Sequence, residues 1–189
     1  MAADAASAAM DRYARGDDRA FAELYDLLAP RLYGFLIRKA GDRALAEDLV
    51  QQTFLHMHRA RATYVTGADV VPWAFALARN LTIDAFRRRR RELLSDTGDL
   101  RGEALAIALD MPADERLQAQ QAADCMQHCF AELPDSQRTA FELLKRDGLS
   151  LAQAAETLGI SVGAVKVRAH RAYEALREAL RAHLGGEVG

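Results

Sequence analysis

This sequence of 189 residues has little of what disulfide-bonded folds, β-sheets or membrane spans require. It contains two cysteines, four prolines and one tryptophan. No apolar run approaches the ~20 residues of a membrane-spanning helix. β-Branched residues seldom occur in runs, whereas half of all residues are hydrophobic. These shortages argue against a disulfide scaffold and favour an all-α protein of one large or two small domains.

Signals for secretion and for catalysis are also missing. Residues 1–10 are rich in alanine but lack the basic start and the long apolar core of a secretory signal, so we expect a cytoplasmic protein. No nucleophile elbow, glycine-rich phosphate loop or paired-carboxylate motif is present. His56 and His58 are two residues apart, and on a helix they point in different directions. The sequence therefore predicts no enzyme and no cofactor.

Cys125, His128 and Cys129 are the residues most suggestive of a metal or redox site. On a helix they would project to roughly one side, but no further ligands lie nearby in the sequence. The apolar face that Cys129 shares with Phe130 and Leu133 is better patterned, and a free cysteine is a common small core residue. We therefore favour core packing over a metal or sensing role.

Charges are segregated along the chain, although the net charge is only −2. Basic residues gather at Arg87–Arg91 and along Lys166–Arg181, and acidic residues cluster early and between residues 96 and 115. Five consecutive arginines exceed what a helix dipole needs, which favours nucleic-acid phosphate contact over a solvated helix end. The separate faces predict both nucleic acid and a basic protein surface as partners.

Apolar spacing of three and four residues predicts two helical domains. The expected parts are an N-terminal extension (1–16), a first helical domain (17–94), a flexible linker (95–112), a second helical domain (113–184) and a tail (185–189). In the first domain, we expect helices over 43–60 and 72–94. An earlier helix should be capped by Asp17 or Asp18 and kinked or interrupted at Pro30.

The apolar stripes of these helices are expected to be buried. Tyr25 belongs to the stripe of the first helix, and Phe86 to that of the helix over 72–94. In the second domain, we expect helices over 113–133 and from Pro134 to about residue 146.

The stretch from Gly148 to Leu184 predicts a helix-turn-helix. Gly159 suits the left-handed residue that ends the first helix, and Ser161 can cap the second, whose apolar stripe begins at Val162. The alternative is an ordinary helical hairpin with solvated basic residues. We favour DNA binding because basic residues lie near the start of the second helix, which is the part of a recognition helix that reaches bases. The candidate contacts are Ser161, Gly163, Lys166, Arg168, His170 and Arg171.

Three segments occur in an order typical of one bacterial family: AEDLVQQTFLHMHR, VPWAFALARNLTIDAFRRRRR and LPDSQRTAFELLKRDGLSLAQAAETLGISVGAVKVRAHRAYEALRE. They resemble the extracytoplasmic-function (ECF) sigma factors, the small two-domain specificity subunits of RNA polymerase. The resemblance covers most of residues 17–182. It implies core RNA polymerase, promoter DNA and an anti-sigma factor as partners, without membrane insertion.

The resemblance also implies roles for particular residues. The polymerase contacts would be Glu47, Asp48, Leu49, Gln51, Gln52 and Phe54. The minus-ten contacts, where an unstacked base is captured, would be Tyr64, Trp73, Arg79, Asn80, Arg87, Arg88 and Arg89. The helix-turn-helix would read the minus-thirty-five element.

The sequence departs from the family pattern at three positions. Ala164 and Val167 stand where the family often has Thr and Ser, which bears on base preference or phosphate contact. Gln52 stands where Glu is common, which bears on the polymerase contact. Two other readings stay open: a helix-turn-helix regulator of the response-regulator type, and a sigma-mimicking protein that sequesters an anti-sigma factor.

Overall fold

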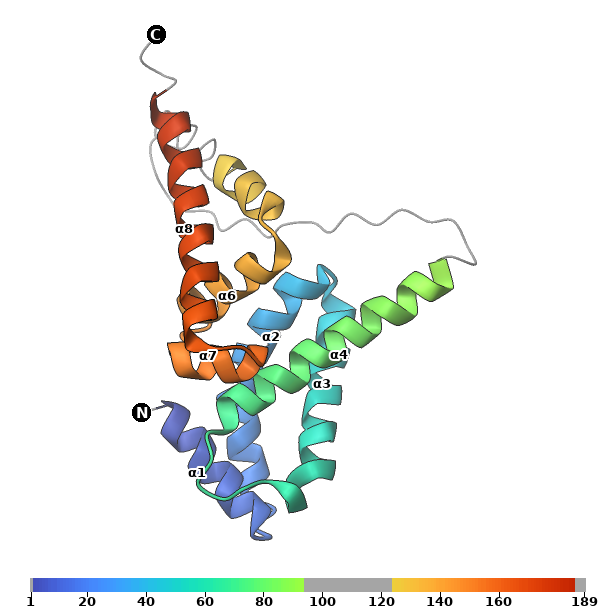
Figure 1. The fold of residues 1–189 in the computed structure, drawn as a ribbon. Helices are drawn as coiled ribbons and strands as arrows, with labels where there is room; N and C mark the ends of the chain where they lie inside the picture. Colours follow the sequence, from blue (N-terminus) through green and yellow to red (C-terminus); the bar gives the residue numbers. More distant parts are fainter. Residues whose placement is uncertain (1, 94–123, 186–189) are drawn as a thin grey trace, which may run out of the picture. The chain divides into compact units, whose positions relative to one another are not determined.

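The computed structural model describes residues 2–93 and 124–185, and every element within these ranges is helical. The described chain divides into two compact units (Figure 1). The first contains residues 2–93 with 156–158, and the second contains residues 124–155 and 159–185. The all-α class with two helical parts is confirmed, while the expected linker over 95–112 lies outside the described residues.

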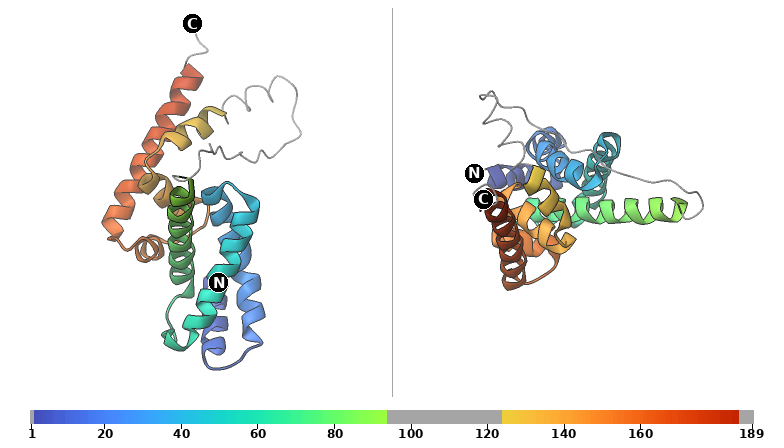
Figure 2. Two further views of the ribbon diagram at one scale, coloured as in Figure 1. Left: turned by 90° about the vertical axis from the view of Figure 1, so that its right-hand side faces the viewer. Right: turned by 90° about the horizontal axis from the view of Figure 1, so that it is seen from above.

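The first unit is built around one long apolar helix. Its elements are α1 (Ala2–Ala14), α2 (Ala20–Ala40), α3 (Arg43–Ala60), the 3₁₀ turn η1 (Arg61–Thr63) and α4 (Val70–Leu93). α2 contacts α1, α3 and α4, and Figure 2 shows the helices from two further sides. Its buried side chains recur every three or four residues, from Leu24 to Leu36. Phe35 meets Phe75 of α4 edge-on, with ring centroids 5.4 Å apart.

The amino-terminal segment differs from the expected extension, because α1 belongs to the core of the first unit. Ala6, Ala9, Met10 and Tyr13 are all buried. Their spacing of three and four residues is helical, but alanines bury little area and give a weak amphipathic signal. The unit therefore begins well before residue 17.

The start and middle of α2 also differ from expectation. Its N-cap residue, Arg19, makes no side-chain capping bond. Asp17 instead accepts a hydrogen bond from the Arg19 backbone N–H at 3.1 Å, just before the helix begins. The helix continues through Pro30, which lies on an exposed side.

Three side chains expected in buried stripes are exposed: Tyr25 and Phe86 at 41% each, and Val162 at 40%. Tyr25 lies at the edge of the α2–α3 contact, with its ring 4.6 Å from that of Phe54. Phe86 lies in the last part of α4, which extends past the other helices of its unit (Figure 1). Val162 is the first residue of its helix, where fewer neighbouring turns cover a side chain.

The second unit contains a helix over 124–132, α6 (Asp135–Lys145), α7 (Leu151–Leu158) and α8 (Val162–Gly185). The earlier residues of the helix predicted over 113–133 lie outside the described part. Leu133, Ala172 and Leu176 form a buried cluster against which Cys129 packs. The Sγ atoms of Cys125 and Cys129 point toward backbone carbonyls of α8, at 3.9 and 3.6 Å. Both cysteines therefore pack against α8, as core packing predicts.

The turn between α7 and α8 has the predicted local geometry. Gly159 has φ +65°, in the left-handed region, and the next N–H donates to the Ala155 carbonyl at 3.1 Å. Ser161 caps α8, because its Oγ accepts a hydrogen bond from the Ala164 N–H at 3.2 Å. Across the described helices, none is long and apolar enough to cross a membrane.

Candidate nucleic-acid interface

α3 presents a polar face to solvent. Asp42 caps this helix, with its carboxylate accepting from the Leu45 N–H at 2.8 Å. Of the six predicted polymerase contacts, four lie on the outer side, with three exposed and one half-buried: Glu47, Asp48, Gln51 and Gln52. The Gln52 amide donates a hydrogen bond to the Asp48 carboxylate. This face is acidic and rich in amides, as a basic protein partner requires.

Leu49 and Phe54, the other two predicted polymerase contacts, face inward. Their exposed fractions are 0% and 3%. The ring of Phe54 packs against Phe21, 6.0 Å between centroids, and against Tyr25. Phe54 thus helps to hold α3 against α2, and because both side chains are buried, neither is accessible to a partner.

One stripe of α4 carries an aromatic ring, an amide and a guanidinium. Trp73, Asn80 and Arg87 are spaced by seven residues, which places them on one side of a helix. Trp73 lies beside Tyr64, with ring centroids 5.6 Å apart and planes inclined by 38°. Arg79 and Arg89 are half-buried. They lie outside this stripe, because successive residues turn by about 100° around the helix axis.

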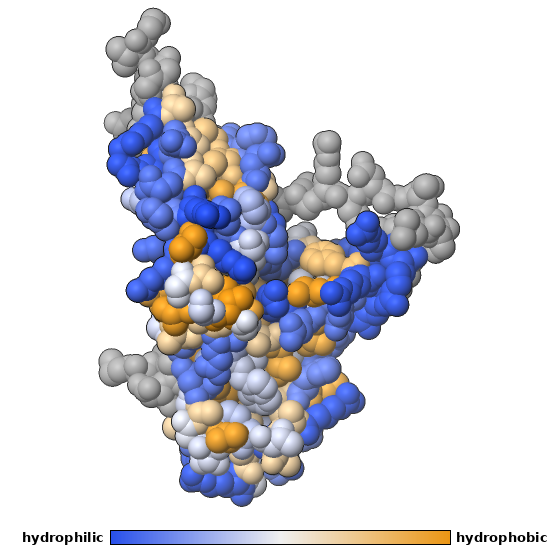
Figure 3. Space-filling model, in the orientation of Figure 1, coloured by the Kyte–Doolittle hydropathy of each residue, from blue (hydrophilic) through white to orange (hydrophobic). Residues whose placement is uncertain are grey.

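A groove of about 800 Å³ lies between α3 and the last part of α4. Its lining residues are Gln52 and His56 from α3, and Leu81, Asp84, Arg87, Arg88, Arg90 and Arg91 from α4. Figure 3 shows hydrophilic side chains gathered over this part of α4. The lining thus includes four arginines and one acidic residue, Asp84, whose carboxylate lies 3.7 Å from the Arg87 guanidinium. The groove is therefore strongly cationic and suits a chain of phosphates.

Sequence reasoning missed the parts that Asp84 and His56 play in this groove. Asp84 precedes Arg87 by three residues, a spacing at which oppositely charged side chains meet on a helix. That signal was available in the sequence. His56 enters the groove because α3 and α4 pack together, and no local signal indicates it.

α8 has an exposed polar face opposite its buried one. Val165 and Ala172 are buried, whereas most of the predicted DNA contacts are exposed: Ser161, Gly163, Lys166, His170 and Arg171. Arg168 is half-buried at the border of the two faces. Val167 is 50% exposed in the middle of the polar face, where an apolar group can contact a thymine methyl.

Substitution of Gly163 tests directly whether DNA approaches the backbone of this face closely. Among the residues that the structure describes, a Cβ added there would meet only the Ser161 Oγ, at 3.9 Å, so nothing in that part of the chain requires glycine. Gly163→Ala is therefore expected to stabilise the protein by up to about 0.5–1 kcal/mol, because alanine loses less backbone entropy in a helix. If DNA approaches the backbone here, the same change weakens promoter binding. Thermal unfolding and promoter binding measured on the same variant check this, and unchanged promoter binding would count against close approach.

The hydroxyl of Tyr64 is held in the loop before α4. It donates a hydrogen bond to the Ala68 carbonyl. Burial, followed by the negative charges of Asp11 and Asp69, raises the pKa of Tyr64 to about 12. The hydroxyl therefore stays protonated and donating at physiological pH.

This raised pKa predicts a pH-dependent stability. Between about pH 10 and about pH 12, folded Tyr64 keeps a proton that the unfolded chain releases, so its contribution to stability is lost as the pH rises. The free energy of unfolding should therefore fall less in Tyr64→Phe than in the wild type between about pH 9 and about pH 11. Denaturant unfolding at the two pH values measures this. Equal falls in both proteins would show that Tyr64 does not titrate in this way.

Comparisons with known proteins define the class. Residues 24–92 match the sigma-70 region 2 family, and residues 123–176 match sigma-70 region 4. The chain is similar to the RNA polymerase sigma factor CarQ of Myxococcus xanthus, at 38% identity over 90% of this chain and 95% of that protein. It is also similar to the ECF sigma factor SigW of Bacillus subtilis, at 31% identity over 88% and 92%.

Among solved structures, the sigma factor RpoE in complex with the anti-sigma factor NepR from Bartonella quintana is similar, with a TM-score of 0.69 and 27% identity. The match covers 85% of this chain and 96% of that one. Both sigma-70 regions are thus present, with region 2 before region 4 along the chain. The chain belongs to the ECF family of RNA polymerase sigma factors.

Proposed function

We propose that this sigma factor divides promoter recognition between its two units. The outer face of α3 binds core RNA polymerase. The Tyr64–Trp73 pair and the arginine groove of α4 bind the minus-ten region, and the exposed face of α8 reads the minus-thirty-five element. Favourable contacts with both elements offset the cost of unstacking promoter bases, which is a few kcal/mol per base.

The observation that carries this proposal is the groove between α3 and α4. Gln52 from the proposed polymerase-binding face and four arginines from the proposed DNA-binding helix line the same space. A chain that binds polymerase on one side of this groove would hold promoter phosphates on the other. Trp73 lies further along the stripe of α4 that includes Arg87, beside Tyr64 of the preceding loop, and a flipped base can stack on this pair.

We also propose how these functions map onto the chain. The minus-ten domain is the predicted segment 17–94 with α1 added, since α1 packs into the same core. Residues 95–112 act as the linker and residues 113–184 as the minus-thirty-five domain. No chemistry is assigned to the chain itself, because polymerase performs the reaction.

An anti-sigma factor is the proposed inhibitor of this protein in the cytoplasm. The similar RpoE structure contains such a partner, NepR. An inhibitor that covers both the acidic face of α3 and the groove would block the binding of polymerase and of promoter DNA together. The exposed α8 face supports direct DNA reading and is not needed by a protein that only mimics a sigma factor.

In vitro transcription tests the proposed function. Core RNA polymerase, the purified protein and a genomic promoter library are combined, and transcript start sites are sequenced. We expect starts downstream of a shared two-element motif. No initiation by folded, inhibitor-free protein would overturn the assignment of these surfaces and favour a regulator or a mimic.

A further inference from the structure

We propose that α1 is a positioning element for promoter opening, because Asp11 and Ser7 hold the loop between η1 and α4 in place. The role rests on the proposed function of Tyr64, which begins this loop, and of Trp73, which follows it in α4. Neither Asp11 nor Ser7 needs to touch DNA. They would act by presenting the aromatic pair in a fixed arrangement.

The middle of the loop is tied to α1 by a carboxylate. Both oxygens of Asp11 accept from the Gly67 backbone N–H, at 2.9 and 3.2 Å. Gly67 has φ +85°, a left-handed conformation that other residues rarely adopt. The bond therefore holds the loop at the residue where its backbone turns.

The far end of the loop is tied to α1 by a hydroxyl. The Ser7 Oγ accepts from the Val70 N–H at 3.1 Å, in a half-buried position. The Asp69 carboxylate also accepts a hydrogen bond from the Val71 N–H, at 3.0 Å. These bonds satisfy backbone donors at the start of α4, which the helix itself leaves unpaired. Trp73 follows within the first turn, so its ring is positioned by the same anchor.

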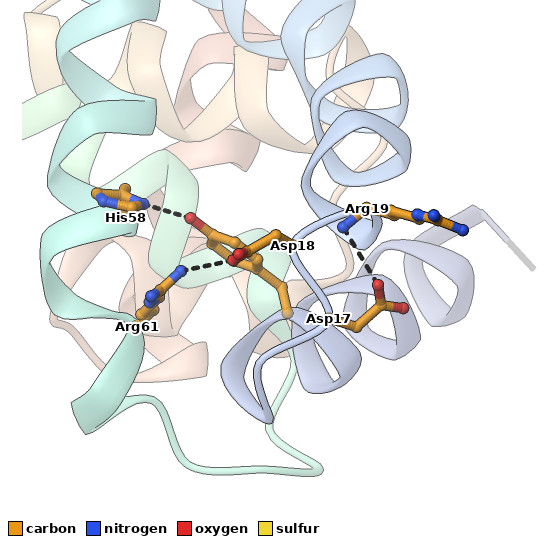
Figure 4. A network of polar contacts seen from close by, with 6 residues as sticks. Asp17, Asp18, Arg19, His58 and Arg61 are labelled. Atoms are coloured by element: carbon orange, nitrogen blue, oxygen red, sulfur yellow. Dashed lines mark hydrogen bonds and ion pairs between the residues drawn. The ribbon is translucent and has the colours of Figure 1, made fainter.

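The near end of the loop is tied by a polar network around η1 (Figure 4). Arg61 donates to the Asp18 carboxylate at 3.0 Å, and its guanidinium lies 5.2 Å from the centre of the Tyr13 ring. Tyr13, which is buried on α1, is hydrogen-bonded to His58 at the end of α3. The loop is thus held at both ends and in its middle by α1 or the turn that follows it.

Such an arrangement lowers the ordering cost of capturing a base. A free loop would lose conformational entropy when it closed on DNA, whereas a loop held by hydrogen bonds to α1 has already lost this entropy on folding. The raised pKa of Tyr64 agrees with this contact, because the Asp11 charge is one of its causes, after burial. α1 would therefore affect promoter opening without affecting polymerase affinity.

The test compares Asp11→Ala with Asp17→Ala in the full-length protein. Asp17 is the matched control, because its exposed carboxylate likewise accepts from a backbone N–H, here that of Arg19 at 3.1 Å, while the Asp11 side chain is half-buried. Both changes remove one negative charge, but only Asp11 reaches the loop. Asp11→Asn keeps an acceptor oxygen and is expected to rescue part of the loss.

Two readouts separate positioning from mere stability. The chain has one tryptophan, so acrylamide quenching of Trp73 fluorescence in the free protein reports on the loop. Promoter opening by holoenzyme, at saturating polymerase, reports on function. For Asp11→Ala we expect Trp73 to be more easily quenched, and opening to fall by about three- to tenfold, the range for loss of one typical hydrogen bond. Polymerase affinity and both readouts of Asp17→Ala should match the wild type.

The failures are distinguishable. If Tyr64→Ala impairs opening but Asp11→Ala behaves like Asp17→Ala in either readout, the positioning role of α1 is overturned. If Tyr64→Ala itself leaves promoter opening unchanged, the proposed base-capture function of the loop is wrong. The functional role proposed for the hydrogen bonds between α1 and the loop is then wrong as well.

Discussion

Reversing the charge of Asp48 is expected to weaken binding to core RNA polymerase by about 100-fold, because placing like charges together across an interface costs several kcal/mol. Asp48 is exposed in the middle of α3, between Glu47 and the amides of Gln51 and Gln52. Arginine is a good helix former, so Asp48→Arg should leave α3 intact. Titration of labelled protein with core polymerase measures the affinity, and thermal unfolding checks the fold.

Asp26→Arg is the matched control for this experiment. Asp26 is also exposed and belongs to the same unit, but it lies on α2, outside the proposed interface. Asp26→Arg changes the net charge by the same amount as Asp48→Arg. If both variants bind polymerase equally well, α3 does not provide the proposed contact.

Replacing Lys166 and Arg171 together by alanine is expected to weaken promoter-complex formation by about 100-fold, since each base or phosphate contact contributes about 1–3 kcal/mol. Both side chains are exposed on the face of α8 opposite Val165 and Ala172. Polymerase affinity should not change. If both residues contact phosphates, the dependence of binding on salt should also become shallower by about two charges.

The structure ranks the single variants on this helix. Arg171→Ala is expected to have a larger effect than Arg168→Ala, because Arg168 is half-buried at the edge of the DNA-facing surface. Arg177→Ala is the control: Arg177 is exposed on the same helix and paired with Glu174 at 3.3 Å, beyond the proposed contact. A double variant that lost polymerase binding along with promoter binding would contradict the separation of the two functions.

Much of the helical layout was readable because its signals are local. α3 occupies 43–60 as predicted, since the left-handed Gly41 and the capping Asp42 act on the nearest turn of backbone. The same reason explains the left-handed turn at Gly159 and the capping of α8 by Ser161, both of which are confirmed. A cap depends on residues two or three positions away, so the surrounding fold changes it little.

The site was predictable only as far as periodicity reaches. Seven-residue spacing places Trp73, Asn80 and Arg87 on one stripe of α4. A run of arginines, by contrast, winds around the helix, and counting residues does not say which of them faces α3. Arg89 does not line the groove, whereas Arg91, absent from the predicted contacts, does.

By itself, the sequence determined most of the helices, the caps of α3 and α8, the turn of the helix-turn-helix and the family, because these depend on neighbouring residues or on motifs in order. Only the tertiary structure decided that α1 is part of the core and that Leu49 and Phe54 face inward. It also decided that Asp11 meets Gly67, 56 residues later. Such contacts depend on how whole helices pack, and packing brings together side chains whose separation along the chain carries no signal.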